Sequence, residues 1–145
     1  MAANPQFLSV PVIAHNSVNT LTANTAKDGT GAVTFIQTNT GGVLADLVAP
    51  AAGLWVDTIV VVPNGTNVAT VMRLFANNGS ANTTAANNEL IDNVTCPATT
   101  NSEVAALQPV TFVVKKLFPS GTKFFYTIGT TVAAGFSVTL FGGAL

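Results

Sequence analysis

Short apolar segments separated by turn residues run through nearly the whole chain. Most are rich in Val, Thr, Phe and Ile and are bounded by Gly, Pro or Asn, which is typical of β-strands. Residues 33–37 and 71–75 alternate between apolar and polar, as expected where one strand face is buried and the other meets solvent. Residues 59–62 are apolar on both faces, which favours a central or covered strand. The pattern predicts ten strands, over residues 7–14, 18–23, 32–38, 43–48, 54–62, 70–76, 90–95, 110–117, 123–128 and 136–141.

The predicted fold is an all-β domain, an antiparallel two-sheet sandwich of about 8–10 strands. A short helical turn over residues 100–107, stopped by Pro109, is the strongest helix signal. The number of strands favours an eight-stranded jelly roll over an immunoglobulin-like sandwich, whose Cys-Trp-Cys pattern is absent. We expect one domain, with its body over residues 31–145. Residues 1–30 form an N-terminal arm and the first strands, and this arm is a candidate to dock on a neighbouring molecule.

Charged residues are scarce, and this limits the possible functions. They make up 8% of the chain, with five basic and six acidic side chains, whereas an ordinary domain has about a quarter. Acid–base catalysis needs clustered ionisable groups, and few are present to cluster. A monomer with so little surface charge is prone to self-association. Composition therefore favours a protein that assembles with copies of itself.

The same composition argues against several classes of partner. The net charge is −1 and the five cations are dispersed, so binding to nucleic acid is not expected. No apolar run approaches the roughly 18–20 residues of a membrane-spanning helix, so no membrane association is expected. Cys96 is the only cysteine, which leaves no intrachain disulfide and no thiolate metal site. We interpret it as a buried small hydrophobe.

Candidate catalytic groups are few. His15 is the only histidine; residues 14–17 are predicted to form a polar bend between two strands, so His15 is interpreted as a turn or interface residue rather than a catalytic base. A carboxylate pair about 5–10 Å apart would support glycoside hydrolysis, although solvated strand ends are the favoured interpretation. The candidates for such a pair are Asp46, Asp57, Glu89, Asp92 and Glu103. Metal-binding and phosphate-binding motifs are absent. We therefore predict no catalytic, metal or cofactor-binding residue, and no enzyme.

Aromatic residues and one polar loop are the remaining candidates for recognition. Phe35, Phe75, Phe112 and Phe141 lie in strand patterns that predict core packing, and Trp55 is predicted at the core rim or in a subunit contact. Residues 124–126 are consecutive aromatics, so one side of this strand should meet something other than its own core. Residues 77–88 are small, polar and uncharged, which predicts an exposed loop.

Several strand-and-turn motifs resemble small β-sandwich proteins encoded beside the structural genes of tailed bacteriophages and prophages. The resemblance covers roughly residues 30 to 145 and contains no reactive groups. Its motifs are residues 71–75 followed by 78–80, residues 90–91, 97–100, 117–121 and 135–139, and the pair Gly142-Gly143. The closing residues 141–145 differ from the acidic or aromatic end associated with this pattern.

The resemblance implies a virion component of the capsid decoration, or cement, type. Such a protein is assembled in the bacterial host cytoplasm, binds the major capsid protein on the outer surface of the shell and commonly forms homotrimers. It has no catalytic apparatus, which agrees with the scarcity of charged groups. The alternative is a host-recognition module of a tail or head fibre, which would bind glycans through the loop at residues 77–88 and exposed aromatics.

Overall fold

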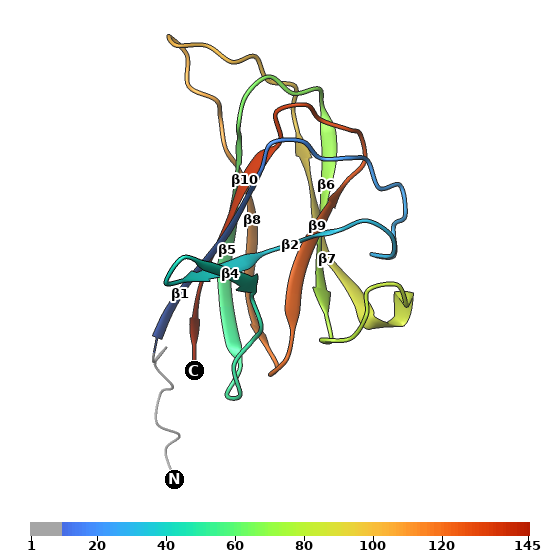
Figure 1. The fold of residues 1–145 in the computed structure, drawn as a ribbon, viewed down its shortest axis with the longest axis vertical. Helices are drawn as coiled ribbons and strands as arrows, with labels where there is room; N and C mark the ends of the chain where they lie inside the picture. Colours follow the sequence, from blue (N-terminus) through green and yellow to red (C-terminus); the bar gives the residue numbers. More distant parts are fainter. Residues whose placement is uncertain (1–9) are drawn as a thin grey trace.

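The computed structural model describes residues 10–145, in which ten antiparallel strands form two sheets (Figure 1). One short 3₁₀ helix, η1 (Ala85–Asn87), is the exception within this range. The strands are β1 (Val10–Val18), β2 (Thr34–Phe35), β3 (Gln37–Thr40), β4 (Val43–Asp46), β5 (Leu54–Pro63), β6 (Thr70–Asn77), β7 (Asn88–Cys96), β8 (Val110–Phe118), β9 (Lys123–Ile128) and β10 (Phe136–Ala144). The predicted all-β sandwich is confirmed.

The strand order is that of a jelly roll with one added hairpin. The larger sheet has the order β4-β3-β1-β10-β5-β8 and the smaller one β2-β9-β6-β7. Without the β3–β4 hairpin, the pairs β1–β10, β2–β9, β5–β8 and β6–β7 nest inside one another along the chain. A ribbon of nested antiparallel pairs wrapped over two sheets is the double Greek key of a jelly roll.

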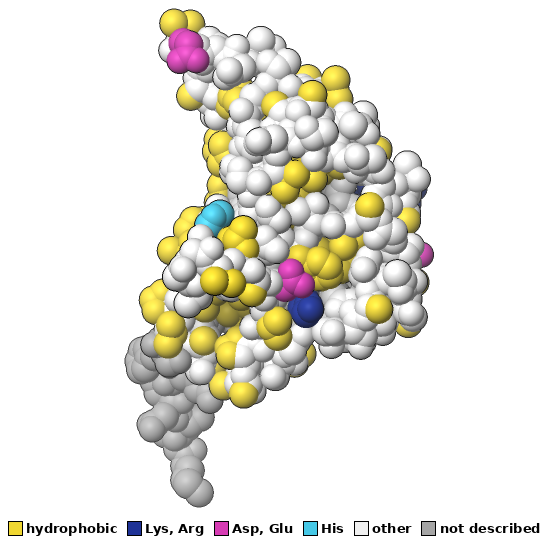
Figure 2. All heavy atoms as spheres, in the orientation of Figure 1, with side chains coloured by type: hydrophobic (Ala, Val, Ile, Leu, Met, Phe, Trp, Pro, Cys, Tyr) yellow, Lys and Arg dark blue, Asp and Glu magenta, His cyan; other side chains and the backbone are white. Residues whose placement is uncertain are grey.

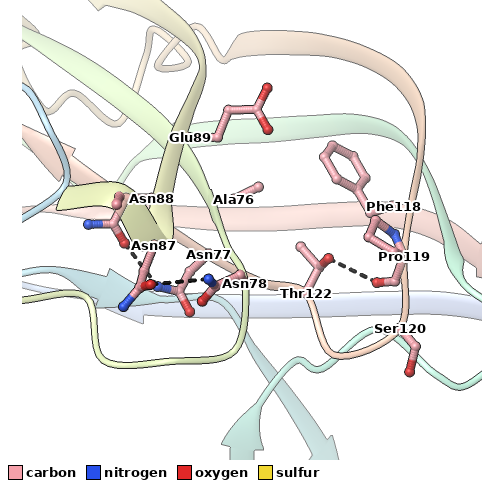
Figure 3. Close-up of a pocket in the computed structure, with 11 residues that line it drawn as sticks. Ala76, Asn77, Asn78, Asn87, Asn88, Glu89, Phe118, Pro119, Ser120 and Thr122 are labelled. Atoms are coloured by element: carbon pink, nitrogen blue, oxygen red, sulfur yellow. Dashed lines mark hydrogen bonds between the residues drawn. The ribbon is translucent and has the colours of Figure 1, made fainter. Parts of the chain in front are cut away.

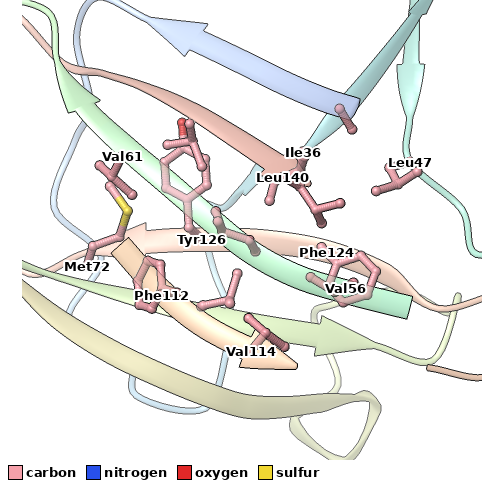
Figure 4. Packing of buried hydrophobic residues seen from close by; sticks show 14 of the residues in the cluster. Ile36, Leu47, Val56, Val61, Met72, Phe112, Val114, Phe124, Tyr126 and Leu140 are labelled. Carbon is pink, nitrogen blue, oxygen red and sulfur yellow. The ribbon is translucent and has the colours of Figure 1, made fainter. Parts of the chain in front are cut away.

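The two sheets enclose one hydrophobic core. Alternate residues of the longer strands β5, β6, β8, β9 and β10 point into it, as the period of two predicts. Ile59 and Leu140 of the six-stranded sheet and Phe124 of the four-stranded sheet are at most 1% exposed. Figure 4 shows these layers meeting, with Met72, Phe112 and Tyr126 between the strands. Burial of this core holds the two sheets together.

β1 differs from the prediction for the N-terminal region. It continues through residues 14–17, where a bend was predicted, and pairs with β10 from Val10 to Val18. The polar side chains fit because the strand alternates: Ala14 is buried, His15 faces outward, and Asn16 donates through Nδ2 to the Phe35 carbonyl at 2.8 Å. Residues 7–9 of the predicted first strand lie outside the described residues.

Two other predicted strands also differ. Of the predicted strand at 18–23, Val18 ends β1, and the remaining residues form only an isolated bridge, Leu21 to Val132. The predicted strand at 32–38 is divided between β2 and β3 at Ile36, which is fully buried and bonds through its N–H to the Phe124 carbonyl at 2.9 Å. Residues 100–107 contain no helix.

Candidate functional site

The outer face of the four-stranded sheet carries an aromatic cluster that the chain itself covers. Phe75 of β6 and Phe125 of β9 stack at 5.1 Å between ring centroids, and Phe35 of β2 meets Phe125 edge-on at 5.3 Å. Phe75 and Phe125 are both 0% exposed. The strand of consecutive aromatics at 124–126 is therefore buried on both sides, and its outward side packs within the same chain.

The cover is the segment at residues 24–31, between β1 and β2, which wraps the four-stranded sheet (Figure 1). It crosses from β9, where the Asn24 N–H bonds to the Ile128 carbonyl at 2.8 Å, to the start of β7, where Asn88 Nδ2 donates to the Asp28 carbonyl at 3.1 Å. The buried Asn24 amide holds the segment in shape by donating to the carbonyls of Thr30 and Ala32.

The outer face of the six-stranded sheet has a different composition, and within residues 10–145 no segment covers it. We define the outer patch as six residues on four adjacent strands: Pro11, Ile13, Trp55, Val113, Leu117 and Phe141. Register places these residues in two rows, with Ile13 beside Phe141 and Thr58 beside Val113 in one, and Pro11 beside Gly143 and Trp55 beside Leu117 in the next.

The outer patch is strongly exposed. Ile13 is 63% exposed, Val113 62%, Leu117 54% and Phe141 39%. Figure 2 shows hydrophobic side chains gathered along the flank formed by β1 and the β3–β4 hairpin, next to the histidine. The prediction of core packing for Phe141 is wrong: Phe136, Val138 and Leu140 point inward, so alternation turns Phe141 outward.

Charge is sparse on this face. Asp57 and Lys115 form an exposed ion pair of 3.7 Å beside the outer patch. Lys115 also has a positive φ of 48°, where β8 breaks its regular register with β5. A bulge and lysines on an edge strand discourage further strands from adding to that edge. The β8 edge is therefore protected, while the flat face beside it is left apolar.

The structure disperses the predicted ionisable candidates. His15 points outward from β1, and Asp46 of β4 pairs with Lys123 at 3.4 Å. Asp57 pairs with Lys115 as described above, and Glu89 and Asp92 are exposed on β7. Glu103 is exposed in the loop between β7 and β8. Among residues 10–145, no group of three or more His, Cys, Asp or Glu side chains is placed to hold a metal ion.

A cavity of about 320 Å³ lies between the predicted polar loop at 77–88 and the turn after β8 (Figure 3). Phe118 and Pro119 line one side, and Asn77, Asn88 and Glu89 line the other. The loop is exposed through most of its length, but Asn77 is buried.

The amides around this cavity are largely engaged within the loop. Asn77 Nδ2 donates to Asn88 Oδ1 at 2.9 Å, and Asn78 Nδ2 donates to Asn87 Oδ1 at 3.1 Å. The Gly79 N–H in turn donates to Asn77 Oδ1 at 2.8 Å. These bonds explain why the sequence uses so many asparagines here: their side chains replace the backbone pairing that a tight loop lacks.

Two buried titratable groups have shifted pKa values. Burial raises the pKa of the Cys96 thiol to about 11, and burial raises the pKa of the Tyr126 hydroxyl above its ordinary value. Cys96 is 1% exposed and belongs to the core, as predicted. Both groups stay protonated at neutral pH, because the charged form is poorly solvated inside the protein.

In the described part of the chain, no helix is long and apolar enough to span a membrane. Comparison of the chain with protein-family models, with curated proteins and with solved structures finds no match.

Proposed function

We propose that this protein is a structural component of a bacteriophage virion, a capsid decoration (cement) protein that binds the outer surface of the shell and stabilises it. The observation that carries the proposal is the outer patch, an apolar area of the jelly roll that none of the described residues covers. Extensive exposed apolar surface on an otherwise well-packed protein is typical of an interaction site. The strand-and-turn resemblance described above supports a virion in particular.

The proposed mechanism is linkage between binding and shell stability. A protein that binds only the assembled, expanded shell stabilises that state by mass action and needs no chemistry. The dispersed ionisable groups of the described residues suit such a role. Self-association as a homotrimer on the shell, contacting the major capsid protein, belongs to the same proposal.

Copy number on purified particles tests the proposal. A decoration protein is expected in hundreds of copies per particle by quantitative mass spectrometry, whereas absence from particles would contradict the proposal. The docking role of the N-terminal arm is tested by deleting only its residues 1–9. A longer deletion would remove β1 from the centre of the six-stranded sheet. Loss of shell binding with unchanged stability would assign the docking role to the arm.

Salt dependence gives an independent test. Since charged side chains make up only 8% of the chain and the ion pair between Lys115 and Asp57 is exposed, shell binding should change by less than about tenfold between about 0.05 M and 1 M NaCl. The measurement is retention of the protein on particles after sedimentation at each salt concentration. Release at moderate salt would show that charge, rather than apolar contact, holds the protein in place.

A second candidate function is glycan recognition by a fibre module, favoured by the cavity beside the loop at 77–88. The exposed Pro119 and the exposed Glu89 carboxylate offer an apolar surface and a hydrogen-bond acceptor, as sugar-binding sites do. Binding to a glycan array that is lost in Glu89→Gln, together with only a few copies per particle, would favour this function over decoration.

A further inference from the structure

We infer that the outer patch is an interface between copies of this chain. The inference deepens the proposed function, since it names the surface through which the decoration protein would assemble. Three features of the molecule support it: the area of the face, its low charge and the protection of the neighbouring strand edge.

The area of the face is close to what a stable interface needs. Strands β1, β10, β5 and β8 lie side by side and have nine or ten residues each. At about 4.8 Å between strands and about 3.4 Å per residue, these four strands outline roughly 600 Å² in projection. A standard interface buries about 800 Å² of accessible surface on each partner. Because projecting side chains add accessible area, the face is large enough for one partner chain.

The charge of the face suits a copy of itself. Lys115 and Asp57 compensate each other, so among the described residues Lys116 is the one cation near the outer patch that forms no ion pair. A copy of this chain can therefore approach the outer patch with little repulsion. A strongly charged partner, in contrast, finds no complementary charge here, and charge complementarity is how such partners are recognised.

The β8 edge and the centre of the face also favour a copy of this chain as the partner. The β8 edge is protected by its lysines and its irregular residue Lys115, so addition of a strand at that edge is disfavoured. The centre of the face includes Gly143, which lies between Pro11 and Trp55 in the register and adds no side chain there. Sheets that pack face to face interdigitate around such low points, about 10 Å apart.

The test compares the solution mass of the full chain with that of matched valine variants. Multi-angle light scattering from about 1 µM to 100 µM should give a mass above the 14.8 kDa of one chain for the unmodified protein. Val113→Lys, in the outer patch, should weaken association at least tenfold. Val104→Lys, at a site 96% exposed in the loop after β7, and Val68→Lys, at a site 54% exposed, should leave the mass unchanged.

Ile13→Lys repeats the test from another strand, and urea unfolding of each variant verifies that it is folded. Mass equal to one chain at every concentration would overturn the inference, as would equal weakening by Val104→Lys and Val113→Lys. The proposed function is judged separately: a monomer found in hundreds of copies on particles removes this interface and keeps decoration. An oligomer that is absent from particles does the reverse.

Discussion

The two outer faces of this sandwich differ in how far their apolar side chains are exposed. On the four-stranded sheet, Phe75 and Phe125 are 0% exposed beneath the segment at residues 24–31. On the six-stranded sheet, Ile13 and Val113 are more than 60% exposed in the outer patch, and none of the described residues covers them. The described part of the chain therefore covers one apolar face and leaves the other exposed.

The difference indicates two roles for apolar surface in one fold. Phe75 and Phe125 of the covered aromatic cluster contribute to the stability of the single chain, because their burial is complete before any partner arrives. The outer patch contributes little to the stability of the single chain, since its side chains remain in water. Its apolar area becomes favourable only when another molecule covers it, which is the basis of the proposed assembly.

A matched pair of phenylalanine substitutions should show the largest difference in stability between the two outer faces. Phe125→Ala removes a fully buried ring and should lower the free energy of unfolding by about 3–5 kcal/mol. Phe141→Ala removes a ring that is 39% exposed and should cost less than about 1.5 kcal/mol in the dilute chain. Urea unfolding at low protein concentration measures both. Equal losses would show that the two faces are equivalent in the monomer.

Asn24 tests the cover itself. Its side-chain amide donates to the carbonyls of Thr30 and Ala32 and accepts from the Ala26 N–H. Asn24→Ala leaves these groups unpaired and should cost about 1–3 kcal/mol, with faster hydrogen exchange along residues 24–31. Asn19→Ala, at an exposed position nearby, is the control and should change stability by less than about 0.5 kcal/mol. If both variants behave alike, the Asn24 bonds do not hold the cover.

Cys96 gives a smaller, pH-dependent effect from β7 in the covered sheet. Its pKa is about 11 in the folded chain, against an ordinary value of 9.0, so the folded state favours the neutral thiol. Stability from this group is fully present below about pH 9 and is lost as the pH rises from about 9 to 11, by at most about 3 kcal/mol. The loss should be absent in Cys96→Ala, as measured by urea unfolding across this range. Identical pH profiles in the two proteins would exclude the thiol as the cause.

Much of the fold could be predicted from sequence, because the period of two and the turn residues are local signals. The alternation at residues 71–75 and 136–140 predicts β6 and β10 and their inward faces. The polar residues at 14–17 led to the wrong prediction of a bend, because the pairing of β1 with β10 is a long-range contact that overrides local polarity. Local sequence therefore identified strands more reliably than it identified where one strand continues.

The outer patch was harder to predict, because it depends on register across four strands. Ile13, Trp55, Val113 and Phe141 come from distant parts of the chain, and each alone has the appearance of a core residue. Scarcity of charge indicated that some surface should be covered by a partner, but it did not say which. The cover at residues 24–31 was equally hidden, since its asparagines resemble those of an ordinary loop.

Hydroxyl-radical footprinting tests directly whether another copy of the chain covers the outer patch, because it measures the exposure of side chains in solution. At about 1 µM and about 100 µM, oxidation of Ile13, Val113, Leu117 and Phe141 is compared with that of the reference residues Val68 and Val104. Self-association through the outer patch predicts that oxidation of the outer patch falls several-fold at the higher concentration while oxidation of the reference residues stays unchanged. Equal oxidation of the outer patch at both concentrations, in a folded protein, would contradict it.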